Sequence, residues 1–226
     1  MLLQDKPELL KLFEIKSAFD EDIVDAMNHG RLVSNLAYRL SKELGYSQDF
    51  CLKMADAGML HDIGKLQLGE YLYGRRTNAL KIEEIKYVRM HPTLGYEFLL
   101  ENRIGDEALR LYIRHHHENF DGSGYPDNVK GEDIPDGSRI LRVCDVYAAL
   151  TSERPYRAAF DKNTTMELMI DEVKNFDMKV FLAFMRVVHD DDFSEVEDYI
   201  DSVNQKVIES RSQRQEKAQG HDLFEE

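Results

Sequence analysis

Hydrophobic side chains recur at three- and four-residue steps along most of the chain. The longest such run extends from Ile23 to Leu44, and Gly45 follows it where a helix would stop. The same spacing predicts further helices over 49–61, 82–90, 94–100, 106–117, 136–151, 164–175 and 178–189. No segment shows a convincing two-residue alternation of the kind that marks a strand. The pattern therefore predicts an all-α protein with a single helical bundle.

One internal segment departs from this pattern. Residues 121–135 contain three glycines and two prolines, a composition that predicts an ordered turn or Ω-type loop. One interpretation is a plain connector between two helices. Because the segment follows a run of histidines, we favour a functional loop.

The C-terminal segment is amphipathic. Five apolar side chains between Phe193 and Val207 alternate three- and four-residue steps, the spacing of a coiled-coil seam. Fewer than two heptads are present, so we expect this helix to pack back on the bundle, with a homodimer through it as the alternative. The chain is thereby divided into an N-terminal lead helix or extension over 1–21, a helical domain over 22–189, and an acidic helix with a polar tail over 190–226.

The charge of the chain narrows its choice of partners. The 226 residues include 29 Lys and Arg against 43 Asp and Glu, a net charge of −14, and residues 190–226 alone hold 12 acids and 4 bases. Basic side chains form no stripe, which argues against binding to DNA or RNA polymers but not to a small phosphate ester. No apolar run approaches the roughly 18–20 residues of a membrane span. The N-terminus is too short and polar for a secretory signal, so we expect a cytoplasmic protein.

Two pairs of adjacent residues suggest chemistry. His61-Asp62 is followed, 55 residues after His61, by His116-His117. A carboxylate can bridge two cations while an imidazole holds one of them. Adjacent histidines on a regular helix cannot point the same way, so the second pair suits a site with more than one ion. These motifs predict a multi-metal centre.

Four further residues fit such a centre. Asp25 and His29 lie four positions apart and so share one helix face. His91 precedes a proline, which marks a helix boundary. Asp145 lies in an apolar run, where an unpaired carboxylate would be very costly. A lone histidine is more often an ordinary core or surface residue, but this combination favours metal ligation.

The motifs resemble those of the HD-GYP family of metal-dependent phosphodiesterases. The resemblance rests on His61-Asp62, Lys65, His91, the HHE-x-x-DG-x-GYP run over 116–126, and Asp145. It continues into the segment 150–157 and covers residues 22–188. It implies an HD-type helical bundle in which residues 121–135 form an ordered loop, called the GYP loop here. It also makes 22–189 the catalytic domain.

The resemblance also implies a ligand set. One metal would be held by His29, His61, Asp62 and Asp145, and a second by His91, His116 and the bridging Asp62. Asp25 and His117 match the positions associated with a third metal, although the family's trinuclear members have the longer glutamate where this chain has Asp25. Mixed nitrogen and oxygen ligands favour iron or manganese, as two or three divalent ions.

Members of the resembled family hydrolyse cyclic di-GMP to linear pGpG, often continuing to GMP, and some act on cyclic GMP-AMP. A metal-bridging hydroxide would attack phosphorus, while Lys65 contacts a non-bridging phosphate oxygen. Arg154 and Arg157 match substrate-contacting positions, where a guanidinium suits both guanine and phosphate. Tyr125 would shape the loop beside the substrate, and the GYP loop would also contact a signalling partner.

Two other classes of function stay open on the sequence. One is an HD-superfamily nucleotidase that acts on mononucleotides, against which only the GYP loop and the 154–157 segment speak. The other is a catalytically silent scaffold that keeps its metals and binds a dinucleotide or a partner enzyme. The presence of Lys65 with the full ligand set argues against the scaffold.

Overall fold

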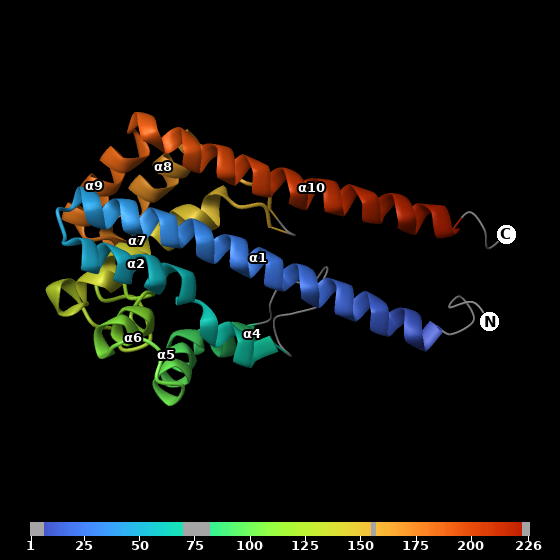
Figure 1. Cartoon of the computed structure of the whole chain (residues 1–226), viewed down its shortest axis with the longest axis horizontal. Coiled ribbons are helices and arrows are strands. Elements are labelled where there is room, and N and C mark those ends of the chain that lie inside the picture. Colours follow the sequence, from blue (N-terminus) through green and yellow to red (C-terminus); the bar gives the residue numbers. More distant parts are fainter. Residues whose placement is uncertain (1–6, 70–81, 155–156, 223–226) are drawn as a thin grey trace.

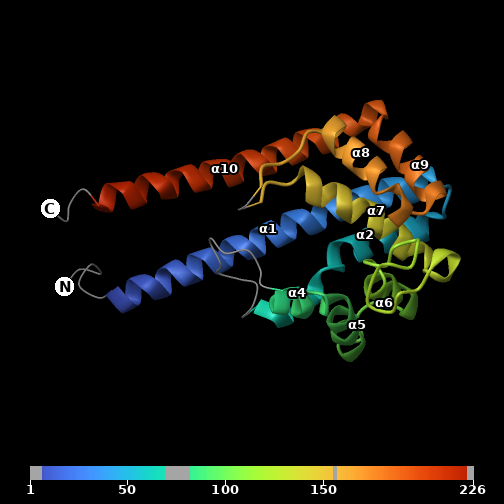
Figure 2. The ribbon, with the colours of Figure 1, turned by 180° about the vertical axis from the view of Figure 1, so that it is seen from behind.

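The computed structural model describes residues 7–69, 82–154 and 157–222, and this part of the chain is helical with no strand. The α-helices are α1 (Pro7–Glu43), α2 (Gln48–Leu60), α4 (Ile82–Val88), α5 (His91–Glu101), α6 (Glu107–Arg114), α7 (Asp136–Thr151), α8 (Lys162–Asp171), α9 (Met178–Val188) and α10 (Ser194–Asp222). The 3-10 helices are η2 (Ile63–Leu68), η3 (Gly131–Asp133), η4 (Val173–Asn175) and η5 (Asp191–Phe193). The shorter helices form a bundle from which α1 and α10 extend toward the same side (Figure 1), and Figure 2 shows this arrangement from behind. The all-α prediction is confirmed.

Helices α1 and α2 form a tight hairpin that sets one wall of the site. The turn uses Gly45 at φ +80°, and Ser47 caps α2 by accepting a hydrogen bond from the backbone N–H of Phe50. Gly58 allows the close crossing, since a Cβ there would lie 2.7 Å from the Cα of Ser34. The α1 helix runs through residues 21 and 22 without a break, so the division expected there falls inside a helix.

A second close approach joins η2 to α5. A Cβ on Gly64 would lie 2.1 Å from the backbone oxygen of His91 and 2.5 Å from the backbone nitrogen of Gly95. Only a glycine lets the two backbones meet this closely. The contact holds the segment after His61 against the start of α5.

Residues 121–135 form an ordered loop, as the sequence predicts. Backbone hydrogen bonds run from Tyr125 N–H to His117 O (3.2 Å) and from Gly131 N–H to Phe120 O (2.9 Å). The buried Glu118 carboxylate accepts the backbone N–H of Asp127 at 2.7 Å. The loop is therefore fastened to the histidine run from which it starts.

The α10 helix packs back on the bundle over its first turns. Val196 and Ile200 are buried in the main hydrophobic core together with Phe193, which confirms the default expectation from the sequence. Further along, Asn204 donates to Thr151 O (2.8 Å) and accepts the backbone N–H of Glu153 (2.9 Å). The helix thereby fastens the chain that follows α7.

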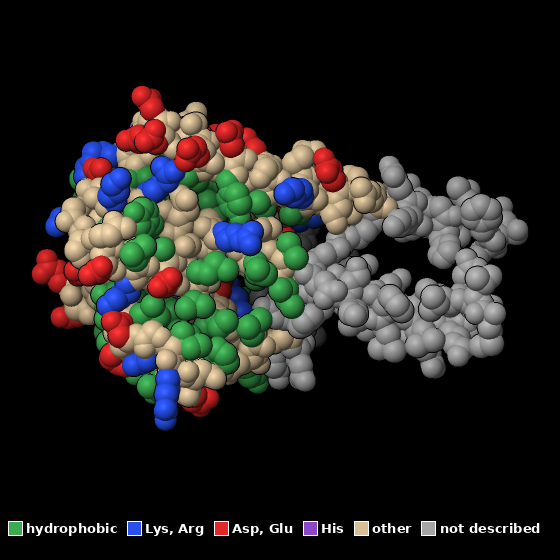
Figure 3. Space-filling model, viewed as in Figure 1, with side chains coloured by type: hydrophobic (Ala, Val, Ile, Leu, Met, Phe, Trp, Pro, Cys, Tyr) green, Lys and Arg blue, Asp and Glu red, His purple; other side chains and the backbone are tan. Residues whose placement is uncertain are grey.

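The surface in Figure 3 shows acidic and basic side chains interspersed with apolar ones, without a basic stripe on this face. Among the described residues, no helix is both long enough and apolar enough to cross a bilayer.

Candidate metal centre

Side chains from five parts of the chain converge on one small volume inside the bundle. α1 contributes His29, and α7 contributes Asp145, whose Oδ1 lies 3.0 Å from His29 Nε2 although the two residues are 116 positions apart. His61 and Asp62 follow the end of α2, and His91 begins α5. The remaining pair, His116 and His117, follows α6 rather than lying within it, because that helix ends at Arg114.

Asp62 lies at the centre of this group. Its Oδ1 is 3.1 Å from His91 Nε2 and 4.0 Å from His116 Nε2. Its Oδ2 is 3.4 Å from His61 Nε2 and 2.5 Å from Lys65 Nζ. The two carboxylate oxygens thus face different histidines, which is the arrangement a bridging ligand requires.

Asp145 is the second carboxylate of the group. Its Oδ1 is also 3.6 Å from His61 Nε2, and its Oδ2 is 3.9 Å from His117 Nδ1. The side chain is 12% exposed, so this charge depends on the surrounding imidazoles or on a cation for compensation.

Three of the histidines are oriented by the backbone. The Nδ1 atoms of His61, His91 and His116 lie 2.8, 2.7 and 2.6 Å from the carbonyl oxygens of Gly58, Val88 and Ile113, each three residues earlier. A carbonyl can only accept, so each Nδ1 must carry the proton and donate it. In the neutral ring, Nε2 then offers a lone pair to the centre, as in most histidine metal ligands.

The polar atoms left without a partner show that this centre fits metal ions. His61 Nε2 and Asp62 Oδ1 are buried and make no hydrogen bond. The Nε2 atoms of His91 and His116 face each other at 3.2 Å, with both protons already placed on Nδ1. Two lone pairs at this distance repel each other unless a cation lies between or beside them. The arrangement of these nitrogen and oxygen atoms therefore fits metal ions.

The ligand atoms fall into overlapping groups whose members all lie within 4.8 Å of one another. These groups are Asp62 with His91, His116 and His117; His29 with His61 and Asp62; and His61 with His116 and Asp145. Asp25 belongs to none of them and is exposed on α1, one turn before His29. Its role as a ligand of a third ion stays a prediction.

Electrostatics favour the protonation states that metals require. Burial lowers the pKa of His117 to about 3, and burial with the neighbouring His117 and His61 holds the pKa of His116 well below its usual value. Burial would raise the pKa of Asp62, but Lys65 and His61 outweigh it and hold that pKa well below its usual value. Burial would lower the pKa of His61 as well, but the two carboxylates of the centre outweigh it and raise that pKa. The neutral imidazole is therefore favoured at His116 and His117, and the ionised carboxylate at Asp62.

The GYP loop covers one side of the centre. The Tyr125 ring stacks on the metal-ligand candidate His117, with centroids 4.7 Å apart, and the guanidinium carbon of Arg89 lies 4.4 Å from the Tyr125 centroid. The Tyr125 ring thus contacts both an imidazole and a cation. Its expected role in shaping the loop fits this position.

The two arginines expected to contact substrate lie just after α7. The Arg157 guanidinium donates to the backbone oxygens of Ala149, Leu150 and Ala158 at 2.8, 3.1 and 3.0 Å. This is C-terminal capping of α7, which uses most of its donors. The backbones of Arg154 and Arg157 pair with each other. Their predicted contact with substrate stays a prediction.

Two other arginines near the centre were missed by reasoning from sequence. Arg142 lies on α7, three residues before Asp145, and its Nε donates to Asn119 Oδ1 at 3.0 Å. Arg89 precedes His91 by two residues. The i, i+3 spacing to Asp145 was the available signal for Arg142, since such residues share a helix face.

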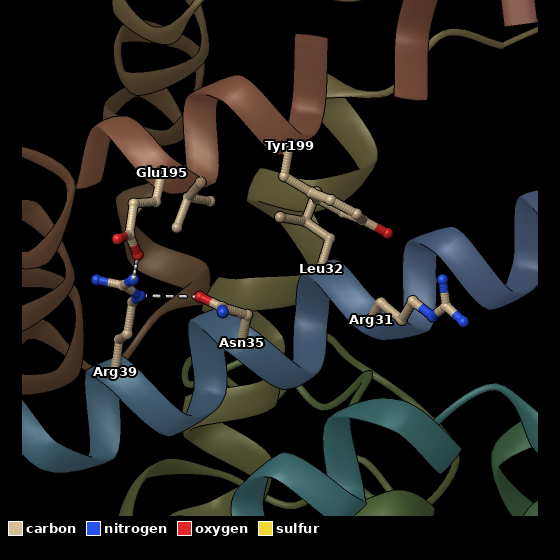
Figure 4. Close-up of a pocket in the computed structure, with 7 residues that line it drawn as sticks. Arg31, Leu32, Asn35, Arg39, Glu195 and Tyr199 are labelled. Atoms are coloured by element: carbon tan, nitrogen blue, oxygen red, sulfur yellow. Dashed lines mark hydrogen bonds and ion pairs between the residues drawn. The ribbon is translucent and has the colours of Figure 1, made fainter. Parts of the chain in front are cut away.

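A separate surface pocket of about 260 Å³ lies between α1 and α10 (Figure 4). None of the candidate metal ligands lines it. At one end Arg39 donates to Asn35 Oδ1 (2.9 Å) and Glu195 Oε2 (3.1 Å), so its charge is already matched. Within the described residues, the candidate metal ligands therefore lie at the histidine centre and not in this pocket.

The fold and the site together define a class of protein, an all-α bundle that encloses histidines and carboxylates able to hold metal ions. The family model described as an HD domain matches residues 5–180. The chain belongs to the HD domain family.

Curated relatives carry the resemblance further. A cyclic di-GMP phosphodiesterase of Pseudomonas aeruginosa is 32% identical over 187 residues, which is 83% of this chain and 44% of the relative. The 3'3'-cGAMP-specific phosphodiesterase 1 of Vibrio cholerae is 33% identical and covers 73% of this chain and 39% of the relative. The cyclic di-GMP phosphodiesterase response regulator RpfG of Xanthomonas campestris is 34% identical, with coverages of 68% and 41%. The HD-GYP resemblance is confirmed, and the chain spans less than half the length of these relatives.

Solved structures agree on the fold. A cyclic GMP-AMP specific phosphodiesterase of V. cholerae superposes with a TM-score of 0.60 at 16% identity, covering 84% of this chain and 52% of that chain. The PgpH HD domain of L. monocytogenes gives 0.53 at 16% identity, with coverages of 72% and 89%. At such identities the likeness shows the HD bundle alone.

Proposed function

We propose that this protein is a metal-dependent phosphodiesterase that hydrolyses cyclic di-GMP to linear pGpG, with hydrolysis onward to GMP as an alternative end point. The proposal rests on buried metal-ligand atoms around Asp62 that have no partner. Two of them, His61 Nε2 and Asp62 Oδ1, make no hydrogen bond. When bound, metal ions would supply an activated water nucleophile and neutralise charge on the phosphate oxygens.

Six side chains would hold the first two ions, and two more would serve a third. The first set is His29, His61, Asp62, His91, His116 and Asp145, and the second is Asp25 with His117. Nitrogen and carboxylate ligands without thiolates favour iron or manganese. The backbone carbonyls that hold the Nδ1 atoms of three of these imidazoles keep the rings oriented before any ion binds.

Lys65 is the proposed catalytic cation. Its Nζ lies 2.5 Å from Asp62 Oδ2, and its side chain is 33% exposed, so it reaches both the centre and an entering substrate. A positive charge here would hold a non-bridging phosphate oxygen, and that contact strengthens as charge develops on the oxygen in the transition state. Arg154, Arg157 and Tyr125 are proposed to contact the nucleotide.

Cyclic GMP-AMP is the second candidate substrate. It is favoured by the V. cholerae relative named as 3'3'-cGAMP-specific, whose 33% identity matches that of the cyclic di-GMP relatives. A guanine base and two phosphodiesters are common to both molecules, so the same centre could accept either.

Several accompanying proposals follow the sequence expectations. These are a cytoplasmic location, a homodimer through α10, a signalling partner at the GYP loop, and a division of the chain into 1–21, 22–189 and 190–226. The acidic surface fits small nucleotides better than nucleic-acid polymers.

The test is an assay of metal-loaded protein against cyclic di-GMP, 3'3'-cGAMP and common mononucleotides, with metal content measured on the same samples. We expect linear pGpG to appear from cyclic di-GMP, with or without GMP after it, and neither product from a Lys65→Ala control at a comparable rate. Release of phosphate from mononucleotides with both cyclic dinucleotides left intact would establish the nucleotidase instead. Tight binding of cyclic di-GMP without any product would establish the scaffold.

A further inference from the structure

Arg142 is a partly buried cation for which the described residues provide no ion pair. Among the described residues its guanidinium makes one hydrogen bond, from Nε to Asn119 Oδ1 at 3.0 Å, and no ion pair. Burial lowers the pKa of this guanidinium, whereas the charges of Asp145, Tyr125 and Glu172 act against that effect. An arginine remains charged in a protein, so burying this guanidinium costs free energy. An anionic ligand that bound to it would offset that cost.

The position of Arg142 is beside the centre but outside the ligand set. Its Cα lies one helical turn before Asp145 on α7, and its hydrogen bond ties the guanidinium to Asn119, two residues after His117. Asn119 is itself held, because its Nδ2 donates to Ser123 Oγ at 2.9 Å. The guanidinium therefore lies between α7 and the segment that leads into the GYP loop, and within the described part of the chain its two terminal nitrogens make no hydrogen bond.

The substrate proposed above carries two phosphodiesters, and only one of them can be cleaved at a time. The metal ions and Lys65, which contacts Asp62, serve the phosphate that reacts. The macrocycle directs its second phosphate to the opposite side of the ring, where it needs a counter-charge of its own. The chain as a whole has a net charge of −14, so the positive charge for the second phosphate must come from a specific residue.

We propose that Arg142 binds the second, uncleaved phosphate of the cyclic dinucleotide, an inference that rests on the proposed function. A guanidinium offers paired N–H donors that match two phosphate oxygens, whereas the Nε hydrogen bond to Asn119 keeps the fork in a fixed orientation. The residue thus selects cyclic dinucleotides over linear ligands with one phosphodiester.

The test compares two ligands that differ in this phosphate. Cyclic di-GMP has two phosphodiesters, whereas the dinucleoside monophosphate GpG has the same two guanines and only one. Dissociation constants are measured by calorimetry in metal-loaded Lys65→Ala protein, in which we expect turnover to be roughly a hundredfold slower, with and without Arg142→Gln. Glutamine keeps an N–H donor for Asn119 and removes the charge. Metal content and Tm are measured on every variant.

Arg142→Gln should raise the Kd for cyclic di-GMP by roughly ten- to a hundredfold, the scale of a lost charged hydrogen bond, and leave the Kd for GpG within about twofold. Arg142→Lys should recover part of the loss because it restores the charge. The control Arg186→Gln, which removes a 61% exposed cation on α9, should change neither Kd.

Equal weakening of both ligands would overturn the inference, because Arg142 would then contact a base or merely hold the loop. Unchanged binding of both would overturn it as well. Since a dissociation constant does not depend on hydrolysis, these results stand even if the wild-type protein proves not to hydrolyse cyclic di-GMP, which would refute the proposed function separately.

Discussion

Replacing Gly64 with alanine should disturb the metal centre without touching any candidate ligand. The new Cβ would lie 2.1 Å from the backbone oxygen of His91 and 2.5 Å from the backbone nitrogen of Gly95. Neither atom belongs to a flexible side chain, so the clash cannot be relieved by a rotamer change. Helix η2 must move away from α5.

The size of the effect follows from these distances. Real Cβ contacts essentially never fall below 3.0 Å, so the backbones must separate by close to 1 Å. Overpacking of this kind costs about 1–3 kcal/mol, which corresponds to a Tm lower by roughly 2–12 °C for a chain of this length. The shift also separates Asp62 from His91, whose ligand atoms are 3.1 Å apart. A misplacement near 1 Å at a reacting centre can reduce turnover about a hundredfold.

Gly95→Ala is the matched control on the other side of the same contact. Its Cβ would meet its nearest neighbours, including Ile113 Cγ2, at 3.4 Å, an ordinary packing distance. Alanine also favours the helix by up to about 1 kcal/mol, so its Tm should equal or exceed that of the wild type. Thermal denaturation with and without added metal, together with turnover, checks both variants. Wild-type Tm and turnover in Gly64→Ala would refute the reasoning, as would equal damage in Gly95→Ala.

Three further predictions concern the site itself. Asp62→Ala should lose most of its metal by elemental analysis, because a bridging carboxylate serves two ions; full occupancy would contradict its assignment. Lys65→Ala should keep its metals while kcat falls roughly a hundredfold, the typical effect of removing one transition-state charge partner, and unchanged kcat would exclude it from the mechanism. Arg154→Ala should raise KM at constant metal content, whereas Arg157→Ala, which uncaps α7, should also lower Tm by a few degrees; identical Tm values for the two would contradict that distinction.

Local patterns in the sequence were sufficient for the fold class and for the identity of the motifs. Helical periodicity depends on which face of each segment is apolar, and that information is carried by neighbours three and four residues apart. The turn at Gly45 and the loop over 121–135 were equally readable, because glycine and proline act through the backbone of their own segment. The helix expected over 106–117 ends earlier, at Arg114, since a helix boundary depends on contacts outside the helix.

The sequence could not show what two arginines contact within the folded chain. Arg157 matched a substrate-contacting position, yet the structure uses its guanidinium to cap α7. Arg142 looked like one polar residue in an apolar helix, yet it lies beside the metal centre without an ion pair among the described residues. Both outcomes depend on which backbone or side chain is nearby in space, and that information is absent from local spacing.

The sequence by itself determined the chemical composition of the site: which imidazoles and carboxylates are available, and that a carboxylate inside an apolar helix must find partners. Only the tertiary structure decided how these groups meet. His29 and Asp145 come within 3.0 Å of each other across 116 residues, because α1 and α7 pack in the same core. The glycine contact between η2 and α5 sets the position of Asp62 against His91. The direction of each imidazole depends on a carbonyl one helical turn earlier, and its lone pair becomes a ligand only where distant segments of the chain deliver the others.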